Sequence, residues 1–136
     1  MSDNSNKRLH EVFYYGLYMD PDVLREKGVE PRNPRICKLE NYELRVGNRA
    51  TLLRSPGKFV YGILYSHTHS EIDSLYWGAG LNEYAAEAVM VGVGEEYVAA
   101  LCCNLIVPPK PGESNPGYQQ QLTMVKKNLG VPVNAG

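Results

Sequence analysis

The residues best suited to holding a ligand follow the first apolar stretch of the chain, at Tyr15-Gly16-Leu17-Tyr18-Met19. The glycine lets bare backbone N–H groups face a pocket, where they can hold a carboxylate or a carbonyl oxygen. The helix expected next has Asp20 as its N-cap, Pro21 at its first position and Gly28 as its stop. A strand–glycine–helix turn is often only structural, so this pattern alone leaves both interpretations open.

A second group of side chains that could do chemistry is His67, His69 and Asp73. The two histidines share strand parity and could hold a metal ion together with the aspartate. A His-x-His pair with one carboxylate is an unspecific pattern, and polar residues that cap a helix explain it equally well. We therefore predict no metal site.

The cysteine content favours buried thiols over disulfides or zinc ligands. The three cysteines, Cys37, Cys102 and Cys103, have neither an even count nor Cys-x-x-Cys spacing. Cys102 and Cys103 are neighbours in a strand-like run, so their side chains should lie on opposite faces of it. A reducing, cytoplasmic location fits this cysteine usage.

The composition is that of one globular domain, with 136 residues, 43% hydrophobic and 21% charged, and a formal net charge of -1. No basic stripe with interleaved aromatic residues is present, so nucleic acid is not an expected partner. No apolar run is long enough to span a bilayer, and the first residues lack the apolar core of a secretory signal. The ten tyrosines suit either the walls of a pocket or half-buried strand positions.

Hydrophobic periodicity and turn residues predict the elements that position these groups. Thr68 and Glu71 have capping-box spacing, Gly94-Glu95 is a tight hairpin turn, and Ser55-Pro56-Gly57 predicts another turn. Asn115 and Gly130 bound the last helix as its N-cap and its stop. The expected strands are His10–Tyr15, 36–39, 42–47, Phe59–Tyr65, Tyr84–Val93 and Glu96–Val107, and the expected helices are Pro21–Lys27, Ile72–Trp77 and 116–129.

This order of elements does not alternate as βαβ units. It predicts a mixed α/β (α+β) fold, in which a mixed sheet curls into a partial barrel with helices flanking it on the outside. We expect a single domain over residues 9–130, a flexible tail at 1–8 and a second tail at 131–136.

Several stretches together resemble the γ-glutamylcyclotransferase-like (AIG2-like) family. Val12-Phe13-Tyr14-Tyr15-Gly16 stands where the family's loop reads Tyr-Gly-Ser/Thr-x-Leu/Met, and Met19-Asp20-Pro21-Asp22-Val23-Leu24 matches the helix of bacterial members. Leu39-Glu40-Asn41-Tyr42-Glu43-Leu44 resembles the family's Leu-x-x-Tyr-x-Leu strand, and Val60-Tyr61-Gly62-Ile63-Leu64-Tyr65 is similar to its Val-x-Gly-x-Leu-Tyr strand. The resemblance covers nearly the whole chain in the right order.

The resemblance implies a γ-glutamylcyclotransferase-like fold and a small enzyme without a cofactor. Such proteins cyclise a γ-glutamyl group to 5-oxoproline and release the attached amine. Amides of the loop at Tyr15–Met19 would hold the substrate's α-carboxylate. A glutamate in a Leu-Asp-x-x-Glu-Gly segment takes a proton from the α-amine and delivers it to the leaving amine, which requires a partly desolvated carboxylate beside the pocket.

The chain departs from the family at positions that carry the chemistry. In Leu75-Tyr76-Trp77-Gly78-Ala79-Gly80, Tyr76 holds the aspartate position and Ala79 holds the catalytic glutamate position. Leu17 replaces the usual Ser or Thr of the loop, and Ala85 and Ala86 stand where an arginine is usual. Because alanine cannot move a proton, the usual mechanism is not expected in this chain.

Three functions follow as hypotheses. The favoured one is a protein that binds a small carboxylate or γ-glutamyl-type ligand at the Tyr15–Met19 loop, walled by Tyr18, Tyr76 and Tyr84. The second is an active cyclotransferase that releases 5-oxoproline from γ-glutamyl amines with a substitute acid/base, such as Glu83 or another group. The third is an interaction protein with a vestigial pocket, in which Trp77 or Tyr76 fills the space of the substrate.

Overall fold

The strands and helices follow one another in an order close to the predicted one. The computed structural model describes Ser5 and residues 7–133. In chain order the elements are β1 (Leu9–Tyr14), the 3-10 helix η1 (Leu17–Met19), α1 (Pro21–Glu26), β2 (Arg32–Val46), β3 (Ala50–Thr68), α2 (His69–Leu75), β4 (Tyr84–Val93), β5 (Glu96–Leu105) and α3 (Pro116–Leu129).

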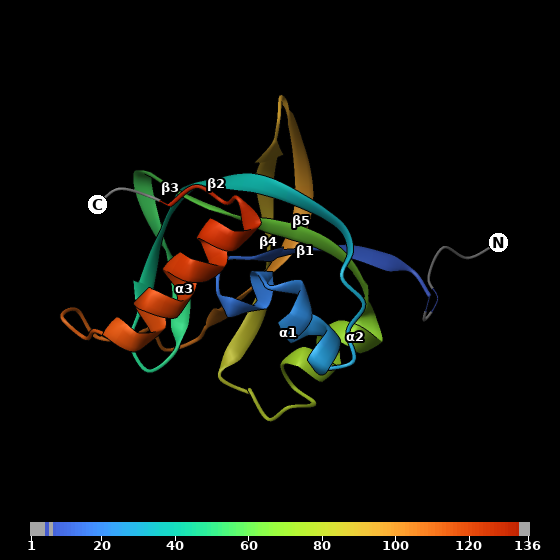
Figure 1. Ribbon diagram of the computed structural model, residues 1–136, viewed down its shortest axis with the longest axis horizontal. Helices are drawn as coiled ribbons and strands as arrows, with labels where there is room; N and C mark the ends of the chain where they lie inside the picture. Colours follow the sequence, from blue (N-terminus) through green and yellow to red (C-terminus); the bar gives the residue numbers. More distant parts are fainter. Residues whose placement is uncertain (1–4, 6, 134–136) are drawn as a thin grey trace.

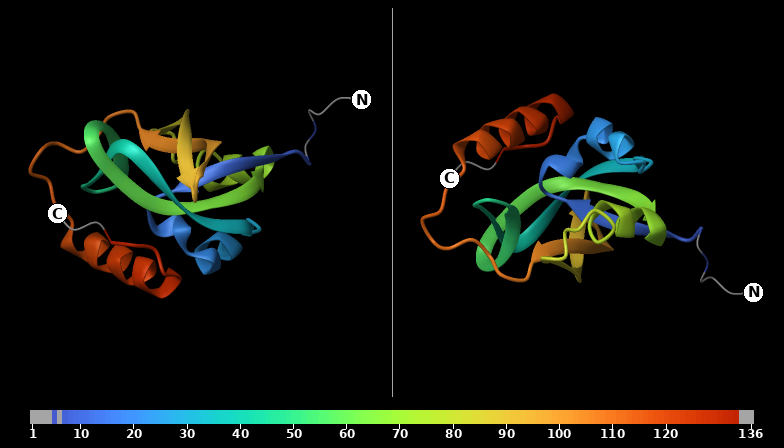
Figure 2. Two further views of the ribbon diagram at one scale, coloured as in Figure 1. Left: turned by 90° about the horizontal axis from the view of Figure 1, so that it is seen from above. Right: turned by 90° about the horizontal axis from the view of Figure 1, so that it is seen from below.

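The strands close into a barrel in the spatial order β1-β3-β2-β4-β5 (Figure 1). β3 pairs antiparallel with β1 and β2, and β4 pairs antiparallel with β5. β1 lies parallel to β5 at Val12 and Leu101, and β2 meets β4 at Lys38 and Gly92. The predicted curled, mixed sheet is confirmed, and its edges meet so that the partial barrel is closed. The helices lie outside the barrel, with α3 beside the β2–β3 hairpin (Figure 2).

The β2–β3 hairpin is longer than the sequence predicts. β2 runs through the expected break between residues 39 and 42, where Asn41 adopts a φ of 67° and the pairing register shifts. The predicted turn at Ser55-Pro56-Gly57 is wrong, because these residues lie inside β3. Gly57 has a φ of 84° and donates its N–H to the Asn41 side-chain oxygen at 3.1 Å. The turn-forming residues therefore make a bulge across the hairpin.

The chain reverses instead at residues 47–49. The N–H of Gly47 donates to the carbonyl oxygen of Arg49 at 3.1 Å, which closes a tight turn between β2 and β3. The turn is tied to the start of α3, because the Asn115 side-chain amide donates to the Gly47 carbonyl at 3.0 Å. Arg49 is thereby held at the end of the barrel.

The predicted helix caps are confirmed. The side chains of Asp20, Thr68 and Asn115 accept the first free N–H groups of α1, α2 and α3, and the capping box of Thr68 with Glu71 is complete. Gly130 ends α3 with a φ of 72°, in the left-handed region that glycine tolerates best.

The predicted range of the second helix, Ile72–Trp77, is wrong at both ends. α2 begins at His69, directly behind its cap Thr68, and ends at Leu75. Tyr76 and Trp77 consequently belong to the irregular segment that leads into β4, and this change brings Tyr76 to the site described below.

The apolar side chains divide into an inner and an outer layer. The inner layer fills the barrel with strand residues such as Leu39, Leu64 and Val91. The outer layer joins the barrel to the helices through residues such as Met19 and Leu122. The prediction that the adjacent residues Cys102 and Cys103 face opposite sides of their strand is confirmed. Both are buried free thiols, and Cys102 belongs to the inner layer whereas Cys103 belongs to the outer one. The described residues include no helix that is long and apolar enough to cross a membrane.

The predicted tails fall largely on residues 1–4, 6 and 134–136, which lie outside the described residues. Val131 differs from a loose tail, because it is 3% exposed and packs in the outer layer. Its N–H donates to the Lys126 carbonyl oxygen at 2.9 Å. The folded part of the chain therefore extends at least to Val131.

Candidate ligand-binding site

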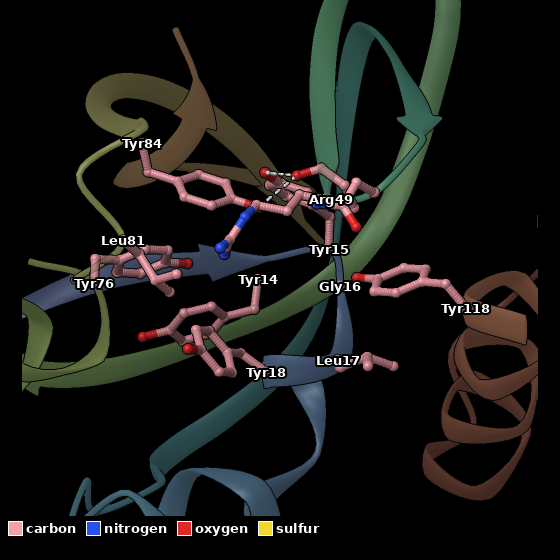
Figure 3. A pocket seen from close by; sticks show the side chains of 12 residues that line it. Tyr14, Tyr15, Gly16, Leu17, Tyr18, Arg49, Tyr76, Leu81, Tyr84 and Tyr118 are labelled. Atoms are coloured by element: carbon pink, nitrogen blue, oxygen red, sulfur yellow. Dashed lines mark hydrogen bonds between the residues drawn. The ribbon is translucent and has the colours of Figure 1, made fainter. Parts of the chain in front are cut away.

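A pocket of about 270 Å³ opens where β1 runs into η1. Its walls come from that junction, from the turn between β2 and β3, from the segment that joins α2 to β4, and from the first turn of α3 (Figure 3). The lining residues are Tyr14, Tyr15, Gly16, Leu17, Tyr18, Asn48, Arg49, Ala50, Tyr76, Leu81, Tyr84 and Tyr118.

Most of the residues predicted for a ligand site meet at this pocket. Those that line it are Tyr15, Gly16, Leu17, Tyr18, Tyr76 and Tyr84. Met19 does not line it. Its side chain is fully buried, its N–H donates to the Gly16 carbonyl at 3.0 Å, and its carbonyl accepts from the Tyr65 hydroxyl at 2.7 Å. Because η1 is a single turn, the leading amides of Leu17 and Tyr18 remain free of intrahelical acceptors.

Gly16 is required at the junction for space rather than for an unusual backbone angle. Its φ is -114°, which other residues adopt. A Cβ at this position would lie 2.6 Å from the hydroxyl oxygen of Tyr118. Tyr118 extends from α3 across the loop, and its hydroxyl reaches Gly16 (Figure 3). Burial raises the pKa of Tyr118, and the neighbouring amide of Leu17 offsets part of that rise.

The tyrosines of the pocket form a connected, fixed wall. The ring of Tyr76 packs against those of Tyr18 and Tyr84, with centroids 5.6 Å and 5.4 Å away. The hydroxyl of Tyr18 donates to the Leu75 carbonyl at 3.1 Å, and that of Tyr84 donates to the Ala50 carbonyl at 2.9 Å. These bonds hold the rings in place and leave the hydroxyl oxygens able to accept a hydrogen bond.

The hydroxyls of this wall are neutral. Burial raises the pKa of Tyr84 to about 12 and raises the pKa values of Tyr15 and Tyr76 well above the ordinary 10.0. Burial also raises the pKa of Tyr18. A phenol with such a pKa is protonated at neutral pH, so none of these groups is a ready general base.

Arg49 is the one charged side chain among the residues that line the pocket, and the sequence analysis missed it. Its guanidinium group reaches into the pocket between the rings of Tyr84 and Tyr14 (Figure 3). Its Nε lies 2.9 Å from Oε2 of Glu83, and its terminal nitrogens have no hydrogen-bond partner among the described residues. The positive charge acts against the rise in pKa of both Tyr18 and Tyr84, so it lies close to both hydroxyls.

The proposed substitute acid/base, Glu83, lies outside the pocket. Its side chain is 59% exposed and is bound to Arg49, while the pocket lining contains no carboxylate. Ala79 is exposed and does not line the pocket either. The correspondence of Ala79 with the family's glutamate stays a prediction.

The pocket is open, and the expected sign of a filled pocket is absent. Tyr76 stands in its wall with about 270 Å³ left free. Trp77 does not line it, and its indole N–H donates to the Tyr84 carbonyl at 3.2 Å instead. Trp77 thus fastens the segment between α2 and β4 to the start of β4.

His67 belongs to the core beneath the pocket. Its Nδ1 lies 2.9 Å from the hydroxyl of Tyr14, its side chain is fully buried, and its Nε2 has no hydrogen-bond partner among the described residues. Burial lowers its pKa from 6.5 to about 4, so the ring is neutral at pH 7. No group of histidine, cysteine and carboxylate side chains in the described part of the chain could hold a metal ion.

Comparisons with known proteins identify the fold. No protein-family model matches the sequence, and no curated protein matches it significantly. A γ-glutamyl cyclotransferase structure aligns with 92% of this chain and 82% of its own, at 21% identity and a TM-score of 0.76. YkqA from Bacillus subtilis aligns with 90% of this chain and 49% of its own, at 22% identity and a TM-score of 0.75. An AIG2-like protein from Mus musculus aligns with 94% of this chain and 97% of its own, at 16% identity and a TM-score of 0.58.

These matches confirm the fold that the resemblance implies: the chain has the fold of γ-glutamyl cyclotransferase and AIG2-like proteins. The likeness extends over nearly the whole chain. At this level of identity it concerns the backbone, so the chemistry of the pocket has to be argued from the side chains that line it.

Proposed function

We propose that this chain binds a small carboxylate-bearing molecule in the tyrosine-lined pocket and does not catalyse the usual cyclotransferase reaction. The observation that carries the proposal is the guanidinium group of Arg49, the single charge in a pocket otherwise walled by neutral groups. The amide of Tyr18, which has no acceptor within η1, belongs to the same pocket and is a further donor for an anion, whereas the amide of Leu17 faces the hydroxyl of Tyr118.

Both sets of donors favour a carboxylate for the same physical reason. The Arg49 side chain is 38% exposed, so solvent screens an anion beside it only in part, and the attraction is somewhat stronger than in bulk water. The planar guanidinium can bind a carboxylate through two parallel hydrogen bonds, and the terminal nitrogens of Arg49 are free to do so. Tyr18 and Tyr84 place hydroxyl oxygens near it that can accept from a protonated or amide group of the ligand.

The charge of the pocket also argues against a ligand that carries an ammonium group. The γ-glutamyl substrates implied by the resemblance have an α-amine, which needs a carboxylate nearby when it is protonated. In this chain an ammonium group in the pocket would face Arg49 and find no lining carboxylate. We therefore expect acids without an amine, such as glutarate or 5-oxoproline, to bind more tightly than glutamate.

The same inventory of groups leaves the cyclotransferase reaction without its proton carrier. The reaction needs a group that accepts a proton from the α-amine near neutral pH. The tyrosine hydroxyls stay protonated at neutral pH because their pKa values are raised, so they cannot accept this proton. Glu83 is exposed and paired with Arg49. The 2.9 Å contact between Glu83 and Arg49 is nevertheless the observation that keeps an active enzyme as the second candidate, since it holds Glu83 at the rim of the pocket.

Calorimetric titration with glutarate, 5-oxoproline and glutamate tests the binding proposal. Arg49→Gln should weaken glutarate binding by about tenfold to a hundredfold, as expected for the loss of charged hydrogen bonds of about 1.5–3 kcal/mol. Arg54→Gln is the matched control, because Arg54 is an exposed arginine of β3 that does not line this pocket. Equal affinity for glutarate and glutamate, or unchanged binding in Arg49→Gln, would contradict the proposal.

An assay of amine release from a γ-glutamyl amine separates the two candidate functions. We expect no turnover above a blank from the natural chain. Turnover that disappears in Glu83→Gln while glutarate binding persists would establish the second candidate and overturn the first.

A further inference from the structure

A second cavity, of about 400 Å³, lies between the β2–β3 hairpin and α3. It shares no lining residue with the tyrosine-lined pocket. Figure 1 shows α3 running beside the hairpin that forms the opposite wall. The lining residues are Glu43, Leu44, Gly57, Lys58, Phe59, Val60, Gln119, Leu122, Thr123, Lys126 and Val133.

Lys126 is the unusual member of this lining. It lies in the last turn of α3 and is only 5% exposed, a degree of burial that is rare for an unpaired lysine. Its amine has no hydrogen bond or ion pair with any described residue. Burial lowers the pKa of Lys126, and no neighbouring carboxylate opposes that effect.

The carboxylate that lines the cavity is already engaged elsewhere. Oε2 of Glu43 lies 2.9 Å from Nζ of Lys58, and Oε1 lies 4.0 Å from Arg45. These two cations lower the pKa of Glu43 and offset its charge. Lys126 is therefore left as the uncompensated charge of the cavity.

Part of the remaining wall is apolar, while Lys58, Gln119 and Thr123 contribute polar groups. Leu44 and Val60 come from the hairpin and Leu122 comes from α3, with Phe59 at the margin. The Nζ of Lys126 is not among the fully buried, unpartnered polar atoms of the described residues, so it keeps some contact with water while most of its side chain is buried. Burial still penalises its charged form, as the lowered pKa shows. A ligand that combines an anionic head with an apolar body would satisfy the ammonium and cover these walls.

We propose that this cavity binds a small apolar carboxylic acid, whose carboxylate pairs with Lys126 and whose hydrocarbon body packs against Leu44, Val60 and Leu122. Its volume falls within the range of about 300–1,000 Å³ usual for small-molecule sites. The site is independent of the tyrosine-lined pocket, which is expected to take compact, polar acids.

Calorimetric titration with octanoate tests this proposal on the full chain, with octanamide and butyrate as comparison ligands. Octanoate should bind more tightly than octanamide, which has the body without the charge, and more tightly than butyrate, which has the charge without the body. Lys126→Met, which keeps the length of the side chain, should weaken octanoate binding at least tenfold and leave octanamide binding unchanged. Lys126→Arg should retain most of the affinity for octanoate.

Lys127→Met is the matched control, because Lys127 is the exposed neighbour on α3 that does not line the cavity. Arg49→Gln separates the two sites, since octanoate binding should be unaffected by it and glutarate binding should be unaffected by Lys126→Met. The proposal is overturned if octanoate does not bind, if Lys127→Met weakens binding as much as Lys126→Met, or if Arg49→Gln is the variant that abolishes octanoate binding. Thermal unfolding of each variant establishes that it is folded.

Discussion

Gly16 offers a quantitative test of how the candidate loop and α3 fit together. An added Cβ would lie 2.6 Å from the hydroxyl oxygen of Tyr118, against the 3.4 Å at which ordinary contact begins, so the hydroxyl must move by about 0.8 Å. The ring carbon that bears the hydroxyl would lie 3.9 Å away, which is an ordinary contact. The conflict therefore involves a single oxygen atom of Tyr118.

The cost of Gly16→Ala follows from that geometry. Tyr118 is half-buried, packs against both apolar layers and lies in the first turn of α3, so it cannot simply turn away. Overpacking of this kind costs about 1–3 kcal/mol of unfolding free energy. Alanine in place of glycine also restricts the unfolded chain, which stabilises the folded state by about 0.4–1 kcal/mol where the backbone angle suits it. We expect a net loss of roughly 1 kcal/mol for Gly16→Ala.

In a Tyr118→Phe background, the change in unfolding free energy caused by Gly16→Ala should reverse its sign. Phenylalanine keeps the ring and removes the conflicting oxygen, so that only the restriction of the unfolded chain remains. Gly16→Ala is then expected to be neutral or to stabilise by about 0.5 kcal/mol. Urea unfolding of the natural chain, both single variants and the double variant gives the coupling energy directly. An equal loss of stability in both backgrounds would refute the argument, because the cost would then come from the backbone of Gly16 rather than from Tyr118.

Two further predictions concern the buried ionisable groups. Lys126→Met should raise the unfolding free energy by on the order of 1 kcal/mol in urea unfolding at pH 7, because burial of the Lys126 side chain penalises its charged form, whereas exposed Lys127→Met should leave the unfolding free energy unchanged. The pKa of His67 is about 4 in the folded protein against an ordinary 6.5, so the unfolded state binds more protons between these pH values. Stability should therefore fall as the pH is lowered from 6.5 to 4, by up to about 3 kcal/mol, and His67→Gln should flatten this part of the profile of urea unfolding against pH. An unchanged slope in His67→Gln would assign the acid sensitivity to another group.

Local signals in the sequence were sufficient to predict the helix and strand ends that depend only on neighbouring residues. The cap residues Asp20, Thr68 and Asn115 each bond an N–H group two or three positions away, so their role is contained in a few consecutive residues. The Gly94-Glu95 turn is equally local, and the register of β4 with β5 follows it from Val93 and Glu96 onward. These features were predicted for that reason.

Features that depend on distant residues were missed. Ser55-Pro56-Gly57 forms a turn in most contexts, but here Asn41 on the facing strand bonds Gly57 and makes a bulge instead. Pro34 in β2 and Pro56 in β3 both lie within long strands, because the two strands pair with each other along one hairpin. At these positions the pairing of β2 with β3 outweighs the local preference of proline and glycine for a turn.

The candidate site shows the same division between local and distant information. The turn at Tyr15–Tyr18 and the tyrosines Tyr76 and Tyr84 could be predicted, because the family resemblance is carried by stretches of consecutive residues. Tyr118 reaches the loop from α3, about a hundred residues further along the chain, and no local pattern marks it. Met19 was predicted to line the pocket because of its neighbours, whereas the single turn of η1 points it into the core.

Arg49 is the most consequential of the missed residues, because its position depends on three separate segments. The hairpin reverses at Gly47 rather than at Pro56, which moves Arg49 from the start of an expected loop over residues 48–58 into the tight turn at the end of the barrel. The tie between Asn115 and Gly47 then fixes that turn against the start of α3, on the side where Tyr118 closes the loop. The family resemblance implies a pocket in which a carboxylate moves a proton. In this chain the lining carboxylate is absent and the charge is a guanidinium. A chain with this fold and a positively charged pocket is expected to prefer a ligand without an amine, so the comparison of glutarate with glutamate decides between the proposed function and the one that the resemblance implies.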